Sequence, residues 1–278
     1  MNPSISESDY SIDQTTRVER RIAHGQYALT HGGKDVGEEV WVIFALRNGM
    51  FRCLTEVDQE WPVPHHRRAQ LDMDGHWNPR ALWAQVDLNS TRTMGTYLAT
   101  EGALDIEITS ARLHEEEHAG RSHVMHNSPG ASRFVNAELT RDSASSNNAN
   151  LGAQVVWHNE IPFLPGTYLD YASALFNFVM LQHLRLAPGG HADFDSVVLT
   201  LPSLEPLRVK QTYARQEDET IILGSDQVPT QRYAITETAS PNLLTTFWTD
   251  AHGIVLRQEL ALEGLPYRCE VLSYNWLG

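Results

Sequence analysis

The sequence predicts a mostly β protein in which an antiparallel sheet curls into an incomplete barrel or roll around one buried helix. Three observations lead to this prediction. Short strand-like runs alternate with turn residues along most of the chain, an Asn-Gly pair joins two of them, and one long apolar segment at about residues 169–186 interrupts the pattern. The chain has 278 residues, of which 41% are hydrophobic, and this is enough apolar content for a large core.

The first strands are expected after a polar N-terminal segment. Residues 1–16 are rich in Ser, Asp and Thr, so we expect a mobile arm there and a single β-roll domain over residues 17–278. The Asn-Gly pair at 48–49 separates the β-rich runs 41–46 and 50–54. Such a pair between two β-rich runs is the strongest short signal of a hairpin.

Further strands show the same alternation of apolar and polar residues. Residues 82–88 alternate as a half-buried strand does, and the runs 96–100 and 104–108 flank a Glu-Gly turn. The segment 141–150 is the best candidate for a loop or linker, because it is rich in Ser and Asn. Towards the C-terminus we expect strands at 196–201, 207–213, 220–223, 232–237, 245–249 and 254–258.

The helix is predicted from its end signals and its composition. Thr167 to Asp170 have the Ser/Thr-x-x-acid form that caps the start of a helix, and Pro188-Gly189-Gly190 ends it. Apolar residues cover nearly its whole circumference, so the helix should lie buried inside the curled sheet or across its mouth. It is either plain core, as in a filled barrel, or one wall of a ligand cavity.

Composition limits the partners. The 21 Lys+Arg against 35 Asp+Glu give a net charge of −14, which repels phosphate backbones and anionic membranes, so we expect no nucleic-acid partner. The N-terminus has no basic start followed by an apolar run, and residues 169–186 contain Asp, Asn, His and Arg. We therefore expect a cytoplasmic protein without stable membrane insertion. Pairing of Cys53 with Cys269 stays open, as does the oligomeric state.

His114, Glu115 and His118 spell H-E-x-x-H, the two-histidine zinc site of many metalloproteases. The two positions inside the motif are also glutamates, and three adjacent carboxylates on a buried helix would carry a large desolvation cost. The preceding residues alternate like a strand. We therefore interpret 114–120 as an exposed turn and predict no metal and no cofactor, with a zinc hydrolase as the second alternative function.

Two other groups of polar residues could carry chemistry. The two histidines and two arginines at 65–68 follow a Pro-rich turn, so we interpret them as a solvated loop rather than a metal or anion site. Asp170 and Tyr171 at the start of the predicted helix, with His183 farther along it, are the candidates for proton transfer. The simpler interpretation of Asp170 is a helix cap.

Three stretches resemble, in their order, bacterial proteins of a spiral β-roll class. They are the strand pair 26–29 and 36–39, the segment 170–175 that opens a helix, and the closing segment 247–256. That class includes proteins labelled glycolipid-binding, a large family of unknown function and the lipoprotein carriers. The resemblance would cover most of residues 20–275. It implies an incomplete barrel around helices with an apolar cleft for an acyl chain, and it brings no catalytic signature.

The predicted function is binding of a hydrophobic or amphipathic, lipid-like small molecule in an apolar cleft between the curled sheet and the helix. Aromatic and Met side chains are enriched in such pockets. The alternative is a metal-independent enzyme of the isomerase or cyclase type, acting on an apolar substrate in the same cavity. The candidates to line the cleft are Trp41, Trp83, Tyr97, Phe176, Met180 and Trp248.

Overall fold

A computed structural model describes residues 18–113, 154–238 and 244–278. Within these ranges the chain forms sixteen strands and one helix. The helix is α3 (Ala174–Leu181). The strands are β1 (Val18–His31), β2 (Lys34–Leu46), β3 (Phe51–Gln59), β4 (His65–Met73), β5 (Pro79–Leu88), β6 (Thr91–Ala99), β7 (Ala103–Arg112), β8 (Gln154–Pro162), β9 (Tyr168–Asp170), β10 (His191–Leu199), β11 (Pro206–Arg215), β12 (Glu219–Leu223), β13 (Asp226–Glu237), β14 (Thr245–Thr249), β15 (Val255–Leu262) and β16 (Leu265–Trp276).

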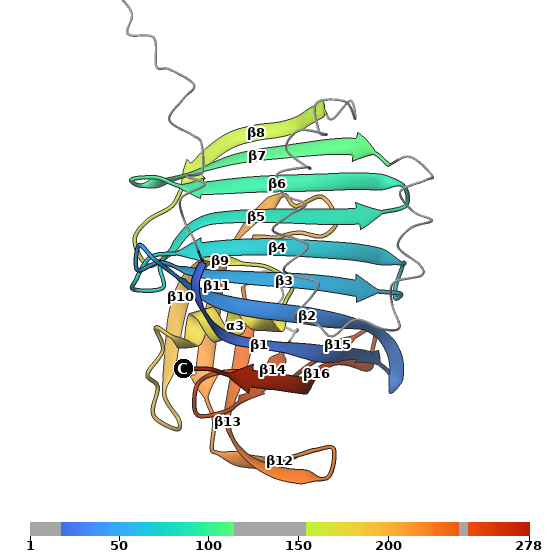
Figure 1. The fold of residues 1–278 in the computed structure, drawn as a ribbon, viewed down its shortest axis with the longest axis vertical. Helices are drawn as coiled ribbons and strands as arrows, with labels where there is room; N and C mark the ends of the chain where they lie inside the picture. Colours follow the sequence, from blue (N-terminus) through green and yellow to red (C-terminus); the bar gives the residue numbers. More distant parts are fainter. Residues whose placement is uncertain (1–17, 114–153, 239–243) are drawn as a thin grey trace, which may run out of the picture.

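The strands belong to one sheet with the order β8-β7-β6-β5-β4-β3-β2-β1-β16-β15-β14-β13-β11-β10-β9, and β12 pairs with β13 outside this path. Every neighbouring pair is antiparallel except β9 and β10, which are parallel. The end strands β8 and β9 do not pair with each other, so the described sheet curls without closing into a barrel. Figure 1 shows β2 to β8 stacked in chain order, with α3 and β9 to β11 behind them.

The predicted hairpins are confirmed. β2 ends at Leu46 and β3 begins at Phe51, and Gly49 in the turn has a φ of 77°, which glycine adopts without steric cost. The Glu-Gly turn likewise joins β6 to β7. Every other predicted strand falls on an observed strand, with differences of a few residues at its ends. Local alternation and turn chemistry therefore suffice for these elements.

Side chains alternate between two faces of the sheet. The inner face packs on α3 and carries one large apolar core, to which Cys53 and Val57 of β3 contribute. The outer face carries the residues in between, and a second apolar cluster lies there on β2. This second cluster consists of Val40, Val42, Phe44 and Leu46. The two cysteines, Cys53 and Cys269, are both buried and free, so they do not form a disulfide.

The helix is buried, as predicted, but it is shorter than the predicted segment 169–186. All eight residues of α3 are buried. The predicted cap is wrong, because residues 168–170 form β9 and pair with β10, which satisfies their backbone groups in a ladder. The cap is Ser173 instead, whose Oγ accepts from the Leu175 N–H at 3.1 Å. No helix in the described ranges is long and apolar enough to cross a membrane.

The interpretation of residues 65–68 as a solvated loop is also wrong. They begin β4, where they pair with β3 on one side and β5 on the other. His65 and Arg67 therefore point to the inner face, and His66 and Arg68 point to the outer face. Arg67 is only 5% exposed. The expectations for 1–16, 114–120 and 141–150 concern residues outside the described ranges.

Candidate functional site

A row of inner-face residues crosses three strands under the N-terminus of α3. In the sheet register, Glu39 of β2 lies opposite Val57 of β3, and Val57 lies opposite Arg67 of β4. The two charged residues thus flank one small apolar side chain. Because neighbouring strands are about 4.8 Å apart, both long side chains can reach the same element above the row.

Glu39 fixes the start of α3. Its carboxylate is 2% exposed, accepts from the Thr55 Oγ1 at 2.6 Å, and also accepts from the Ser173 hydroxyl and the Ala174 N–H. A carboxylate at a helix N-terminus is favoured by the exposed N–H groups there. Burial raises the pKa of Glu39, and these hydrogen bonds together with the charge of Arg67 limit the rise.

Arg67 holds the residue just before the cap. Its Nη1 donates to the Ala172 carbonyl at 2.9 Å, and its Nη2 donates to the Gln59 Oε1 at 3.2 Å. Together with Glu39 it clamps residues 172–174 against the sheet. Glu39, Thr55, Arg67, Tyr171 and Ser173 are called the inner polar site below.

Some polar atoms of this region have no hydrogen-bond partner among the described residues. They are the buried Tyr171 hydroxyl, the buried Arg67 Nε–H and the indole N–H of Trp41, which stands two residues beyond Glu39 on the same face. Burial raises the pKa of Tyr171 to about 12, with the charge of Arg67 lowering it and that of Glu39 raising it, so Tyr171 lies near both. Buried polar groups without partners are few in folded proteins and destabilise the fold.

Asp170 points away from this site into a second polar group. Gln211 Nε2 donates to the Asp170 Oδ2 and to the Glu237 Oε1, each at 2.8 Å, and the Ser196 hydroxyl donates to the Gln211 Oε1 at 2.8 Å. Burial raises the pKa of Asp170 to about 6; the hydrogen bond from Gln211 lowers it, and the charge of Glu237 raises it further. This carboxyl group can exchange a proton near neutral pH.

The three candidates for proton transfer are not brought together. Tyr171 belongs to the inner polar site and Asp170 to the group around Gln211. His183 lies beyond the end of α3, where its Nε2 is 3.1 Å from the Trp77 carbonyl and its ring packs edge-on against Tyr168. The Asp170 carboxylate accepts a hydrogen bond from the backbone N–H of Tyr171, but among the described residues no side-chain hydrogen bond or ion pair joins any two of the three functional groups.

The six side chains predicted to line a cleft divide between the two faces. Trp41, Tyr97, Phe176 and Met180 belong to the inner core and are nearly inaccessible to solvent. Trp83 lies between the inner residues Leu82 and Ala84, so it points to the outer face. Trp248 is 7% exposed and belongs to the large core cluster, and its Nε1 donates to the Glu219 Oε2 at 2.9 Å while Arg232 and Arg257 pack on its ring.

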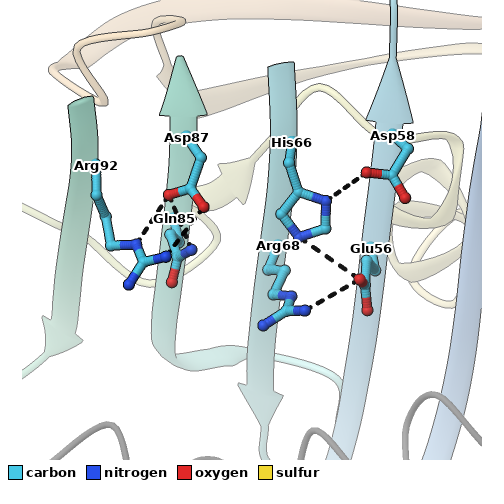
Figure 2. Close-up of polar contacts among 7 residues, drawn as sticks. All are labelled: Glu56, Asp58, His66, Arg68, Gln85, Asp87 and Arg92. Atoms are coloured by element: carbon cyan, nitrogen blue, oxygen red, sulfur yellow. Dashed lines mark hydrogen bonds and ion pairs between the residues drawn. The ribbon is translucent and has the colours of Figure 1, made fainter. Parts of the chain in front are cut away.

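A polar network lies on the outer face, across β3 to β6 (Figure 2). The His66 Nδ1 is 2.6 Å from the Asp58 Oδ1, and the Arg68 Nη2 donates to the Glu56 Oε1 at 3.1 Å. On the next two strands, Arg92 makes two hydrogen bonds to Asp87, which also accepts from the Gln85 amide at 3.0 Å. Glu56, Asp58, His66, Arg68, Gln85, Asp87 and Arg92 are called the outer network below.

Part of the outer network has the residue types of a metal site. Ligand atoms of Glu56, Asp58 and His66 lie within 4.8 Å of one another. The guanidinium of Arg68 already supplies a positive charge at Glu56, and Asp58 already binds the imidazole. These contacts explain the group as ion pairs. The H-E-x-x-H residues His114, Glu115 and His118 lie outside the described ranges.

A shallow cleft of about 260 Å³ lies near the β12–β13 hairpin. Most of the residues that line it are polar or charged, among them Asp218, Glu219, Thr230 and Asp250. Asp218 pairs with Arg215, and Glu219 pairs with Arg232 and accepts from the indole N–H of Trp248. None of the six side chains predicted to line a cleft is among its lining residues.

Sequence reasoning did not single out Glu39, and it considered Arg67 only as part of a metal or anion site at 65–68, which it rejected in favour of a solvated loop. One signal could have identified them: both occupy positions of the strand alternation that face the core, where charged residues are rarely buried without a partner. Residues 65–68 were assigned to a loop, so the alternation was not followed through Arg67.

No family model and no curated protein sequence matches this chain. The solved structures that are similar to it include three proteins of low sequence identity. A DUF1089 family protein from Pseudomonas aeruginosa is 15% identical, with a TM-score of 0.45, over 78% of this chain and 87% of its own. A β-barrel-like protein of the domain of unknown function DUF1849 from Brucella abortus is 9% identical, with a TM-score of 0.47, over 92% and 99%.

The third is the hypothetical lipoprotein YmcC from Escherichia coli (K12), which is 10% identical, with a TM-score of 0.31, over 92% of this chain and 87% of its own. All three likenesses are distant, and none of them indicates a ligand or a reaction for this chain. The resemblance to the spiral β-roll class stays an expectation of the sequence.

Proposed function

We propose that the protein binds a hydrophobic or amphipathic, lipid-like small molecule between the inner face of the sheet and α3. The observation that supports this is the inner polar site, where Tyr171 and Arg67 keep unpartnered polar atoms in an otherwise apolar core. Such groups destabilise a fold unless something else binds them. A guest with an apolar body and a polar end would pack against the core and satisfy them.

The guest requires α3 to move. The side chains of α3 fill the inner face, since Phe176 and Met180 are 2% and 4% exposed. A helix of eight residues is not stable by itself in water, so α3 depends on its contacts with the sheet. Its polar anchors lie at its start, on Glu39 and Arg67. We infer that α3 and residues 182–190 swing away from the sheet when the ligand enters.

Binding can be tested with Nile red, a neutral apolar probe that fluoresces in apolar surroundings. The full chain should bind it saturably, and dodecanol should displace it. Phe176→Ala or Met180→Ala should change the affinity about tenfold, which corresponds to about 1.4 kcal/mol. Trp83→Ala, on the outer face, is the matched control and should leave it within about twofold. Absence of saturable binding, or an equal effect of Trp83→Ala, would contradict the proposal.

A second candidate is a metal-independent enzyme of the isomerase or cyclase type acting on the bound apolar molecule. It is favoured by Asp170, whose pKa of about 6 suits an acid or base near neutral pH. Chromatography of a ligand recovered after long incubation separates the two functions. An enzyme converts the ligand and loses that activity in Asp170→Asn, whereas a binding protein returns the ligand unchanged.

A further inference from the structure

The guanidinium of Arg67 is buried without an acidic partner. It is 5% exposed, and its recorded acceptors, the Ala172 carbonyl and the Gln59 side-chain oxygen, are both neutral. In the described part of the chain no carboxylate lies within ion-pair distance of it. A buried charge without a counter-charge destabilises a protein by several kcal/mol, on the order of 3–5 when a partner is removed. The outer network contrasts with this, because Arg68 pairs with Glu56.

Glu39 is the nearest acid in the row, and it compensates Arg67 only in part. Its carboxylate oxygen is taken up by Thr55 and Ser173, which dock α3. Burial raises the pKa of Glu39 and the charge of Arg67 lowers it, so the two groups interact through space without an ion-pair contact. The inner polar site therefore holds a guanidinium that no carboxylate of the described residues contacts directly.

The unpartnered atoms indicate what is missing. Arg67 Nε–H and Trp41 Nε1–H can only donate hydrogen bonds, and the hydroxyl of Tyr171 can donate as well. The site thus lacks acceptors. An ammonium group would add donors and repel Arg67, and a hydroxyl would leave the charge of Arg67 uncompensated. A carboxylate supplies several acceptor sites and one negative charge, in the planar geometry that a guanidinium binds best.

A phosphate monoester fits less well. It carries a charge of about −1.5 to −2 at neutral pH. Arg67 is the one cation recorded in the inner polar site, and Glu39 already places an acid in the same row, so each further negative charge buried there is costly. Of the two anions, a carboxylate adds the smaller negative charge.

Building on the proposed binding function, we infer that the ligand is an amphipathic carboxylic acid. Its carboxylate binds Arg67 and Tyr171, and its apolar body packs between the sheet and α3. The carboxylate takes the place of the missing acceptors and neutralises the guanidinium.

The test compares four twelve-carbon probes that differ only in the polar end: dodecanoate, dodecanol, dodecylamine and dodecyl phosphate. Binding to the full chain is measured by displacement of Nile red, below the micellar range of each probe. Dodecanoate should bind at least about tenfold more tightly than the other three. If dodecanol binds as well as dodecanoate, the carboxylate assignment is overturned while the proposed function stands. If no probe binds, both fail.

Substitutions test whether the preference for dodecanoate depends on Arg67. Arg67→Met keeps the length of the side chain and should reduce dodecanoate affinity to that of dodecanol, and Tyr171→Phe should reduce it several-fold. Arg68→Met is the matched control, one residue away on the outer face, and should keep the full preference. A preference for dodecanoate that survives Arg67→Met in a folded variant also overturns the assignment. If Arg67→Met does not fold, the four probes on the unmodified chain still decide it.

Discussion

The inner polar site and the outer network use the same kinds of residues on the same strands, and they differ in how their charges are paired. β3 and β4 contribute Glu56 and Arg68 to the outer face, where they form an ion pair (Figure 2), although the Arg68 Nε–H is buried without a hydrogen-bond partner among the described residues. β4 contributes Arg67 to the inner face, where no acid of the described residues lies within ion-pair distance. The inner acid, Glu39, binds hydroxyls and the start of α3 instead.

This difference is the reason for placing the proposed ligand at the inner polar site. Charged side chains that pair across neighbouring strands stabilise the sheet, so no ligand is needed to account for them. A buried guanidinium with neutral acceptors, next to an unpartnered tyrosine hydroxyl, adds a cost that the fold alone does not require. The inner site is therefore the part of the sheet where a ligand is expected.

The largest expected contrast in stability is between the two glutamates. Glu39→Ala leaves the Thr55 and Ser173 hydroxyls and the Ala174 N–H without their acceptor, and should lower the free energy of unfolding by about 3 kcal/mol. Glu56→Ala removes the ion pair with Arg68, which can turn to water, and the 3.5 Å contact with the His66 ring, and it should lower the free energy of unfolding by about 1 kcal/mol. Urea unfolding of both variants measures this. If the two variants lose the same free energy of unfolding, α3 is not anchored through Glu39.

The second contrast is in the pH dependence of stability. The pKa of Asp170 is raised to about 6, so its contribution to stability is present below about pH 4 and is lost as the pH rises through 6. As the pH rises from 4 to 7, the free energy of unfolding of Asp170→Asn should therefore increase relative to that of the unmodified protein, by at most about 3 kcal/mol. Urea unfolding at pH 4, 5.5 and 7 measures this gain.

Asp74, in the β4–β5 turn, provides the control of opposite sign. Burial acts to raise its pKa, but hydrogen bonds from Asn78, the His76 N–H and Arg80 outweigh this and lower it to about 2. Its contribution is present above about pH 4 and is lost as the pH falls through 2. Asp74→Asn should cost about 1 kcal/mol at pH 7, after allowance for solvent screening, and progressively less in acid. If the change in the free energy of unfolding varies with pH in the same direction for Asp74→Asn and Asp170→Asn, the contrast is refuted.

The smallest expected effect is that of Arg68→Met. Its side chain is 35% exposed, so loss of the pair with Glu56 should change the free energy of unfolding by less than about 1 kcal/mol. Because exposed ion pairs are screened by salt, the difference from the unmodified protein should shrink further in high salt. Thermal unfolding at low and high salt checks this. A loss of several kcal/mol would assign the outer network a structural role that the ion pair does not explain.

Most strands were predictable because their signals are local. The turn at 48–49 and the alternation at 82–88 each depend on a few neighbouring residues, and the structure confirms both. The burial of α3 was predictable as well, since its residues are almost all apolar. Its start was not, because Tyr168 to Asp170 satisfy a helix-capping pattern but gain more backbone hydrogen bonds by pairing with β10.

The candidate site was predictable only in fragments. Tyr171 was nominated for proton transfer and lies in the inner polar site, and Trp41 lies beside it. Arg67 was missed because a Pro-rich turn before it suggested that residues 65–68 form a loop. Trp83 was nominated for its residue type, but strand alternation points it to the outer face.

The sequence by itself determined the β-rich class, the hairpins and the presence of one buried helix, because these follow from side-chain periodicity and turn residues. The tertiary structure alone decided that Glu39 and Arg67 flank Val57 beneath the cap of α3. The physical reason is that this arrangement depends on the register between strands and on the docking of a distant helix. A single strand carries no information about which side chains of other strands will lie opposite its own.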